Sequence, residues 1–295
     1  MLLTSTNLNS LLDTIGKPLD LIPTGFGALD ALVGGLLPGE LVVLAARPGM
    51  GKTALVLDLA THIGKTNPVL FLSLEMQGGL LMERLLSSKS AVPKERMHSP
   101  DLTEEEKGRI LLATENIGQL TLFVEDNPVL TPDRFDHLLG QFCSKHKNPL
   151  VIIDYFQLCR ANARFQNRTY ELQEVLESIL GTIKKYGARC ILSSQLNREA
   201  EKRDNHWPKL SDLRDTGFLE QAADKIIFIH RPDYYSISEG DFNTQDTGES
   251  YLVVAKNRHG RTGFVKLAFI ADITSFKNIG KDDEVEIFDP NDIPF

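Results

Sequence analysis

Eight short runs of almost entirely apolar residues recur along this 295-residue chain, and they constrain its fold more than any other feature. Each run has the length of a β-strand, and a strand that is apolar on both faces must be covered on both. Such strands are typical of a mainly parallel sheet between two layers of helices. The candidate strands are 41–46, 69–75, 120–126, 150–154, 190–195, 225–230, 251–256 and 264–270.

Helical periodicity fills most of the gaps between the early runs, so the sequence predicts an α/β fold with a central sheet. The last runs are separated by turns instead, which predicts a C-terminal antiparallel β extension. Two polar loops, 160–169 and 197–216, follow candidate strands, and ligands of open parallel sheets collect beyond the carboxyl ends of the strands. The predicted helices are 53–64, 79–91, 103–117, 132–147 and 170–187.

The net charge of −8 does not by itself exclude a nucleic-acid partner, because it is unevenly distributed. The last fifteen residues carry −5, which leaves −3 for residues 1–280. No apolar run is long enough to span a bilayer, and the first residues lack the pattern of a secretory signal, so we expect a cytoplasmic protein with no membrane partner. The three cysteines are too widely spaced to indicate a disulfide framework or a metal site.

A glycine-interrupted turn joins the first candidate strand to the first candidate helix in "LAARPGMGKTALVLDLA", residues 44–60. Successive backbone N–H groups in such a turn form an anion nest at the start of a helix. Lys52 would reach the outer phosphates of ATP, and Thr53 would hold Mg²⁺. Ala46 stands where the usual motif has glycine, but its methyl group can be accommodated. The predicted cofactor-binding residues are Arg47, Pro48, Gly49, Met50, Gly51, Lys52 and Thr53.

Two carboxylates end neighbouring apolar runs and complete the predicted site. Asp154 ends "LVIID", where a carboxylate holds magnesium opposite Thr53. Glu75 ends "VLFLSLE", where a carboxylate can act as the base for the water that attacks the γ-phosphate. Taken alone, each residue is equally compatible with an ordinary solvated strand end.

The order of the motifs resembles the C-terminal motor domain of DnaB-type replicative helicases over roughly residues 20–270. The matching segments are "PTGFGALDALVGGLLPGELVVLAARPGMGKTALVLDLA", "FLSLEM", "VIIDYFQL", "SSQLNRE", "LSDLRDTGFLEQAAD" and "AKNRHGRTG". The resemblance implies a RecA-like P-loop NTPase core that works as a hexameric ring on single-stranded DNA, with ATP between subunits. The phosphate turn with alanine in front also occurs in that family.

The resemblance also implies roles for individual residues. Glu75 matches the catalytic glutamate, Asp154 the magnesium aspartate, and Gln195 the residue that senses the γ-phosphate. Lys256 and Arg258 match the basic pair that reaches the neighbouring subunit's ATP. The residues that match the loop gripping the DNA backbone are Arg214, Asp215 and Gly217.

The basic pair also has support from local chemistry. Lys256 and Arg258 are two residues apart, so on an extended strand both point to one face. Without the family context a solvated hairpin is the preferred explanation, because basic hairpins are common as edge protection. Arg164 and Arg168, in the earlier polar loop, are candidates for the same DNA pore as the loop of Arg214, or are solvated loop arginines.

The domain prediction has three parts: a short N-terminal segment (1–19), a motor domain (20–275) and an acidic flexible tail (276–295). The first segment contains leucines that would be the remnant of a linker helix, and the resemblance implies that the collar domain of the family is absent. The tail ends in "FDPNDIPF", similar to the acidic tip of bacterial single-stranded DNA-binding proteins. Phe295 would dock a replication or repair protein, or the tail would cover the DNA pore, or it only solubilises the chain.

Two functions remain open from the sequence. The first is a helicase that couples ATP hydrolysis to movement on single-stranded DNA and to unwinding during replication. The second is a RecA-like, DNA-dependent ATPase for recombination, repair or mobile-element maintenance that does not unwind. A non-catalytic adaptor is disfavoured, because an adaptor needs no complete hydrolytic set.

Overall fold

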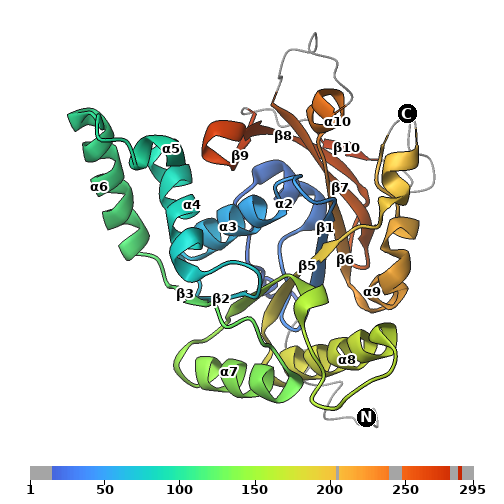
Figure 1. Ribbon diagram of the computed structural model, residues 1–295. Helices are drawn as coiled ribbons and strands as arrows, with labels where there is room; N and C mark the ends of the chain where they lie inside the picture. The colour runs from blue at the N-terminus through green and yellow to red at the C-terminus, as the bar shows by residue number, and fades with distance from the viewer. Residues whose placement is uncertain (1–14, 204–205, 239–247, 280–284, 288–295) are drawn as a thin grey trace.

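The computed structural model describes residues 15–203, 206–238, 248–279 and 285–287, and all the strands in these ranges belong to one sheet (Figure 1). The order along the sheet is β10-β8-β7-β6-β1-β5-β4-β2-β3, and β9 also pairs with β8. The strands are β1 (Leu41–Ala46), β2 (Val69–Ser73), β3 (Leu122–Glu125), β4 (Leu150–Asp154), β5 (Arg189–Gln195), β6 (Lys225–His230), β7 (Glu249–Asn257), β8 (Gly263–Ile270), β9 (Ser275–Asn278) and β10 (Val285–Ile287).

The strand directions confirm the predicted fold class. Strands β3, β2, β4, β5, β1 and β6 are parallel, whereas β7, β8, β9 and β10 are antiparallel to the strands that they pair with. The sheet extends further along the chain than the sequence predicts. β10 and most of β9 lie within residues 276–295, which the sequence analysis assigns to a flexible tail.

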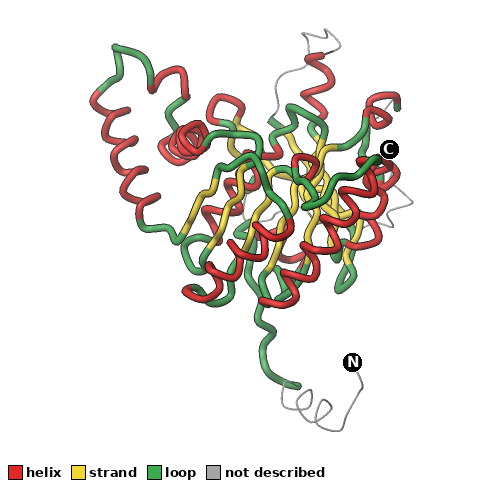
Figure 2. The backbone as a smooth tube through the Cα atoms, turned by 60° about the horizontal axis from the view of Figure 1, so that its bottom comes forward, coloured by secondary structure: helices red, strands yellow, loops and turns green. Residues whose placement is uncertain are grey.

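Helices cover both faces of the sheet, with α2 and α3 on one face and α7 and α8 on the other (Figures 1 and 2). Among the described helices, none is both long enough and apolar enough to cross a bilayer. The α-helices are α2 (Gly27–Val33), α3 (Lys52–Ile63), α4 (Gly78–Ser90), α5 (Lys94–Met97), α6 (Glu104–Gly118), α7 (Pro132–Lys145), α8 (Arg168–Tyr186), α9 (Gly217–Ala222) and α10 (Pro232–Ser238). The 3₁₀ segments are η1 (Phe156–Leu158), η2 (Arg198–Lys202), η3 (Leu210–Thr216) and η4 (Ala271–Ile273).

Alternating side chains of the central strands supply the two halves of the core. In β1, Leu44 packs in the cluster that contains α3, whereas Val43 packs in the cluster that contains α7 and α8. Ile191 and Leu192 of β5 divide in the same way. Both faces of these strands are therefore buried, which explains why the runs are apolar throughout.

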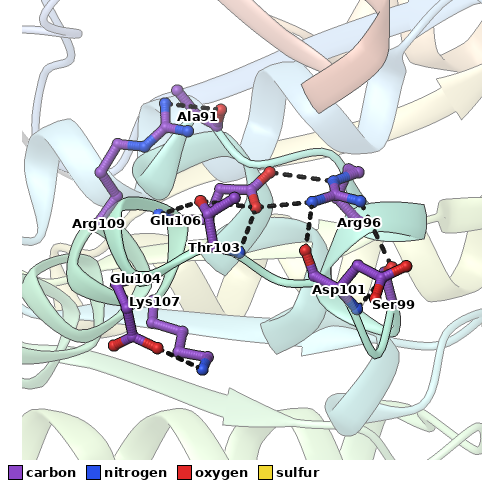
Figure 3. A network of polar contacts seen from close by, with 9 residues as sticks. All are labelled: Ala91, Arg96, Ser99, Asp101, Thr103, Glu104, Glu106, Lys107 and Arg109. Atoms are coloured by element: carbon purple, nitrogen blue, oxygen red, sulfur yellow. Dashed lines mark hydrogen bonds and ion pairs between the residues drawn. The ribbon is translucent and has the colours of Figure 1, made fainter.

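Helices α4, α5 and α6 form an arm at one end of the sheet, and α6 extends away from the body (Figures 1 and 2). Thr103 and Glu106 form a capping box that starts α6. The Arg96 guanidinium donates to both carboxylate oxygens of Glu106, at 3.0 and 2.8 Å (Figure 3). These hydrogen bonds are the main reason that the pKa of Glu106 is lowered to about 2. The corner between α5 and α6 is therefore held by a charge-assisted pair.

A buried ion pair lies at the amino edge of the parallel strands. Lys225, at the start of β6, pairs with Glu40, just before β1, and both side chains are at most 2% exposed. The Lys225 ammonium also donates to the Gly35 carbonyl at 2.9 Å, and Glu40 accepts from the Leu37 N–H at 2.8 Å. The pair thus joins the start of β6 to the turn that leads into β1.

Replacing Lys225 by methionine should destabilise the fold strongly, because it leaves the Glu40 carboxylate buried and unpaired. The expected loss is about 3–5 kcal/mol in the free energy of unfolding, measured by urea titration. The double variant Lys225→Met, Glu40→Gln keeps an acceptor for the Leu37 N–H without the charge, and it should recover most of the loss. A single variant with the parental unfolding midpoint would show that the pair is not needed.

Candidate nucleotide-binding site

The turn between β1 and α3 has the backbone geometry that a phosphate site requires. Gly49 and Gly51 both adopt left-handed conformations, with φ of 83° and 90°. A Cβ on Gly49 would lie 2.8 Å from the Tyr234 ring, and a Cβ on Gly51 would lie 3.0 Å from the Phe276 ring. Within the described chain no side chain caps the start of α3, so its first N–H groups face the turn. The predicted anion nest is therefore sterically restricted to glycine at both positions.

A pocket of about 480 Å³ opens beside this turn, and it contains most of the predicted cofactor residues. Met50 is the exception, because it is buried beneath the turn and does not line the pocket. The Arg47 guanidinium is engaged within the protein, since it pairs with Glu201 at 2.7 Å and donates to the Leu196 carbonyl at 2.6 Å. The lining residues are Arg47, Pro48, Gly49, Gly51, Lys52, Thr53, Ala54, Glu75, Met76, Leu80, Arg84, Gln195, Phe269 and Thr274.

Asp154 lies directly opposite Thr53, as the paired motifs predict. The Thr53 hydroxyl donates to one carboxylate oxygen of Asp154 at 2.8 Å, and the Ser193 hydroxyl donates to the other. Asp154 is 2% exposed, so the two hydroxyls fix its orientation. The residues fit Mg²⁺, because a hydroxyl and a carboxylate are the hard oxygen ligands that this ion prefers, and phosphates would complete the shell.

Lys52 and Glu75 both line the pocket. Burial lowers the pKa of Lys52, while the negative charges of Asp154 and Glu75 act to raise it. Glu75 is exposed at the end of the segment that follows β2, where a water molecule has access. A cation at the floor and a carboxylate at the rim suit phosphate binding and activation of water, respectively.

Gln195, at the end of β5, lines both this pocket and a second one of about 400 Å³. The second pocket lies between the two polar loops that the sequence places at the carboxyl edge. Its lining residues are Gln157, Arg168, Thr169, Leu172, Gln195, Leu196, Asn197, Asp212 and Leu213. The structure therefore brings the two loops together, with Gln195 between them and the nucleotide pocket.

The predicted DNA-binding residues divide into three groups. Arg164 is exposed on the first loop. Arg168 is engaged within the protein, because its guanidinium donates to the carbonyls of Gln157 and Cys159 and pairs with Glu171. Arg214 and Asp215 lie in η3, but their side chains are outside the described part of the structure, and Gly217 begins α9.

Lys256 and Arg258 lie together at the opposite edge of the sheet. Both cations donate to carbonyls at the end of α9: Lys256 to Glu220 at 2.5 Å, and Arg258 to Gln221 at 2.5 Å. Arg258 also pairs with Asp224 at 3.1 Å. Burial lowers the pKa of Lys256, and the positive charge of Arg258 lowers it further. The two side chains thus share one face, as their spacing predicts.

Sequence reasoning missed two polar residues of the site. Arg84 reaches the pocket from α4, but a lone arginine in a helical segment carries no motif. Tyr155 follows Asp154, and the Lys52 ammonium lies 4.6 Å from the centre of its ring. The sequence did offer a signal for Tyr155, because it directly follows Asp154 and so lies at the same carboxyl edge of the sheet.

Phosphate-turn geometry at the end of a central parallel strand, with a strand-end carboxylate beside it, defines a P-loop nucleotide-binding domain. Comparison with known proteins identifies the family within this class. The chain belongs to the DnaB-like helicase C-terminal domains, whose family pattern matches residues 22–278.

Similar proteins agree with this assignment. The replicative DNA helicase DnaB of Buchnera aphidicola subsp. Baizongia pistaciae is 34% identical over 281 residues, which are 94% of this chain and 59% of that protein. The DnaB of Geobacillus stearothermophilus is 32% identical, over 90% of this chain and 58% of that protein. The chain therefore spans a little under three fifths of the length of these relatives.

Two solved structures have the same fold. One is an isolated ATPase domain, which superposes with a TM-score of 0.85 at 28% identity and covers 93% of this chain and 97% of that domain. The other is a DnaB-like replicative helicase, solved in a study of its interactions with primase, and it also gives 0.85 at 28% identity. That match covers 95% of this chain and 68% of the helicase.

Substituting Gly51 by alanine should weaken nucleotide binding and destabilise the fold. The left-handed conformation alone costs a non-glycine residue about 1–2 kcal/mol, and the new Cβ would press on the Phe276 ring. Urea unfolding and titration with a fluorescent ADP analogue measure the two effects. Gly108→Ala is the matched control, because a Cβ on Gly108 in α6 would meet nothing within 4 Å. At this helical position alanine should raise the free energy of unfolding by about 0.5–1 kcal/mol.

Proposed function

We propose that this chain is the ATP-hydrolysing motor of a replicative DNA helicase, which translocates on single-stranded DNA as a hexameric ring. One observation carries the proposal. The pocket beside the glycine turn, with Glu75 in its lining, lies at the carboxyl edge of the sheet, whereas Lys256 and Arg258 are held on carbonyls of α9 at the amino edge. Family membership supports the same conclusion, because the relatives that match the chain are named replicative DNA helicases.

Four residues would carry the hydrolytic chemistry. Lys52 would neutralise negative charge on the outer phosphates, and Thr53 and Asp154 would hold the metal ion. Glu75 accepts a proton from the attacking water, which makes the water a better nucleophile. Bound Mg²⁺ would supply further neutralisation of the phosphate charge. Asp154 is buried and Lys52 is half-buried, so both charges lie toward the floor of the site.

Arg258 and Lys256 cannot serve the nucleotide of their own subunit. The Arg258 N–H donates to the Asp224 carbonyl, and the Asp224 carboxylate accepts from the N–H of Leu41, the first residue of β1. The phosphate turn begins after Ala46, so the six residues of β1 separate the two sites by about 20 Å. Two cations held on one face suit the phosphates of a neighbouring subunit, where an arginine stabilises developing charge. A ring in which each subunit presents both edges satisfies this requirement.

The DNA would be held by the loops at the carboxyl edge. Gln195 lines both the nucleotide pocket and the second pocket. A movement of Gln195 in response to the γ-phosphate would therefore act directly on the loop that contains Arg214, Asp215 and Gly217. Contacts from such a loop to the DNA backbone position a protein without reading sequence. Arg164, exposed on the neighbouring loop, is placed to add a further phosphate contact, whereas Arg168 stabilises the base of that loop.

Glu75→Gln should retain ATP binding and lose turnover, because the amide cannot accept the proton of the attacking water. We expect the rate of hydrolysis to fall about a hundredfold or more, measured by phosphate release, with the affinity for ATP little changed. Glu105→Gln, at an exposed position of α6, is the matched control and should hydrolyse at the parental rate. Parental turnover of Glu75→Gln would exclude Glu75 as the base.

Arg258→Ala and Lys52→Ala should each be inactive alone and recover activity when mixed. In mixed rings the Arg258→Ala subunit supplies an intact site and the Lys52→Ala subunit supplies the arginine. With equal, random mixing roughly a quarter of the interfaces combine an intact site on one side with an arginine on the other. About a quarter of the parental turnover should therefore return. A Lys52→Ala and Glu75→Gln mixture has no complete site and should stay inactive. Absence of recovery in rings shown to contain both variants would contradict a shared site.

Unwinding of a forked DNA duplex separates the proposed helicase from an ATPase that only binds DNA. A helicase should release the labelled strand in the presence of ATP, and the Glu75→Gln variant should not. DNA-stimulated hydrolysis without strand release would favour the RecA-like ATPase for recombination or repair instead.

A further inference from the structure

Tyr155 occupies a position between the groups that bind phosphate and the residue that separates the two pockets. The Lys52 ammonium lies 4.6 Å from the centre of its ring, within the range of a cation–π interaction. On the other side its hydroxyl hydrogen bonds with the Gln195 side chain. Burial raises the pKa of the Tyr155 hydroxyl, and the nearby charges of Glu75 and Asp154 raise it further. Tyr155 therefore contacts a phosphate-binding group with its ring and Gln195 with its hydroxyl oxygen.

The segment that contains Tyr155 also holds the backbone of Gln195. Two residues further on, the Gln157 amide accepts from the Gln195 N–H at 3.3 Å and donates to the Gln195 carbonyl at 3.3 Å. The same amide donates to the Ser194 hydroxyl at 2.9 Å. The Gln157 carbonyl in turn accepts from Arg168 at 2.7 Å. Contacts thus continue from Lys52 through Tyr155 and Gln195 to the base of the first polar loop. The second polar loop, 197–216, adjoins Gln195 as well, because its residues Asn197, Asp212 and Leu213 line the same pocket as Gln195.

We propose that Tyr155 is a positioning residue that transmits the state of the nucleotide pocket to Gln195 and, through it, to the loop 197–216. The inference rests on the proposed function and specifies how its nucleotide and DNA sites are coupled. Tyr155 does not contact the reacting atoms in this role.

The physical basis is a competition for the Lys52 ammonium. With no phosphate present, the ammonium is attracted to the face of the Tyr155 ring. A bound phosphate offers the ammonium a full negative charge, so the cation shifts its interaction from the ring to the phosphate. The ring then loses one of its two contacts, and the hydroxyl that holds Gln195 is released from a fixed position. Because Gln195 lines both pockets, its change of position alters the second pocket as well.

Tyr155→Phe tests the hydroxyl alone, because phenylalanine keeps the ring beneath Lys52. Trp207 is the single tryptophan of the chain and lies buried in the loop 197–216, 4.5 Å from the His230 ring, so its fluorescence reports on that loop. The probe is a slowly hydrolysed ATP analogue, with its affinity measured by titration. In the parent, we expect the analogue to change the Trp207 emission and single-stranded DNA to accelerate hydrolysis.

In Tyr155→Phe the affinity for the analogue should stay within about twofold of the parent, because Lys52 and the phosphate turn are intact. The change in Trp207 emission and the factor by which DNA accelerates hydrolysis should each fall at least about fivefold, the lower end of allosteric coupling. A residue that only supported the fold would lower affinity, stability and coupling together.

Tyr186→Phe is the matched control. Tyr186 also has a lysine ammonium over its ring, that of Lys185 at 4.7 Å, but it lies at the far end of α8 from the nucleotide pocket. This variant should match the parent in all three measurements. A Tyr155→Phe variant with parental emission change and parental DNA stimulation would overturn the inference, as would a parent that binds the analogue without any change at Trp207. A parent that binds no ATP would instead contradict the proposed function itself.

Discussion

The hydrogen bond between Thr53 and Asp154 joins segments 101 residues apart in the sequence, and the arrangement of the site depends on it. Thr53 lies in the first turn of α3, and Asp154 ends β4, with β5 between β1 and β4 in the sheet. The Ser193 hydroxyl of β5 fills the remaining side of the carboxylate. The ends of β4 and β5 and the start of α3 are therefore joined by one buried acid. A shift of any strand by one residue would remove the acid from the phosphate turn.

The phosphate turn is also supported by packing from β9, in addition to its contacts with β4 and β5. Asp58, buried in α3, accepts from the Phe276 N–H at 2.8 Å and pairs with Lys89 of α4 at 3.0 Å. Phe276 belongs to β9, and its ring lies against Gly51. The C-terminal antiparallel strands thus support the turn directly. This explains why a nucleotide site built on parallel strands is accompanied by a β extension, since β9 packs directly behind the turn.

The sequence predicts the parallel strands and longer helices well because they are buried on both faces or strongly amphipathic. The eight candidate strands and five candidate helices all occur, with shifts of a few residues at their ends. The short elements were not predictable in this way: α2 and α10 have seven residues each, and β10 has three, which is too few for a periodic pattern. The motifs alone predict Lys52, Thr53 and Asp154 as residues of the site, and the structure places Thr53 and Asp154 in contact. Arg84 and Tyr155 required the structure, because their role depends on which neighbours the turn and α4 bring to them.

Helix α9 is short, and it lies between the predicted DNA-binding loop and the basic pair Lys256 and Arg258. It begins at Gly217, immediately after the loop of Arg214 and Asp215, and its last carbonyls accept from Lys256 and Arg258. These cations satisfy carbonyls that have no partner within the helix and complement the negative end of its dipole. A cation that turns toward a phosphate on another subunit must leave those carbonyls to water. The carbonyls at the end of α9 would consequently compete with an outside anion for Lys256 and Arg258. The stronger the hydrogen bonds from these cations to α9, the lower the affinity of the basic pair for that anion would be.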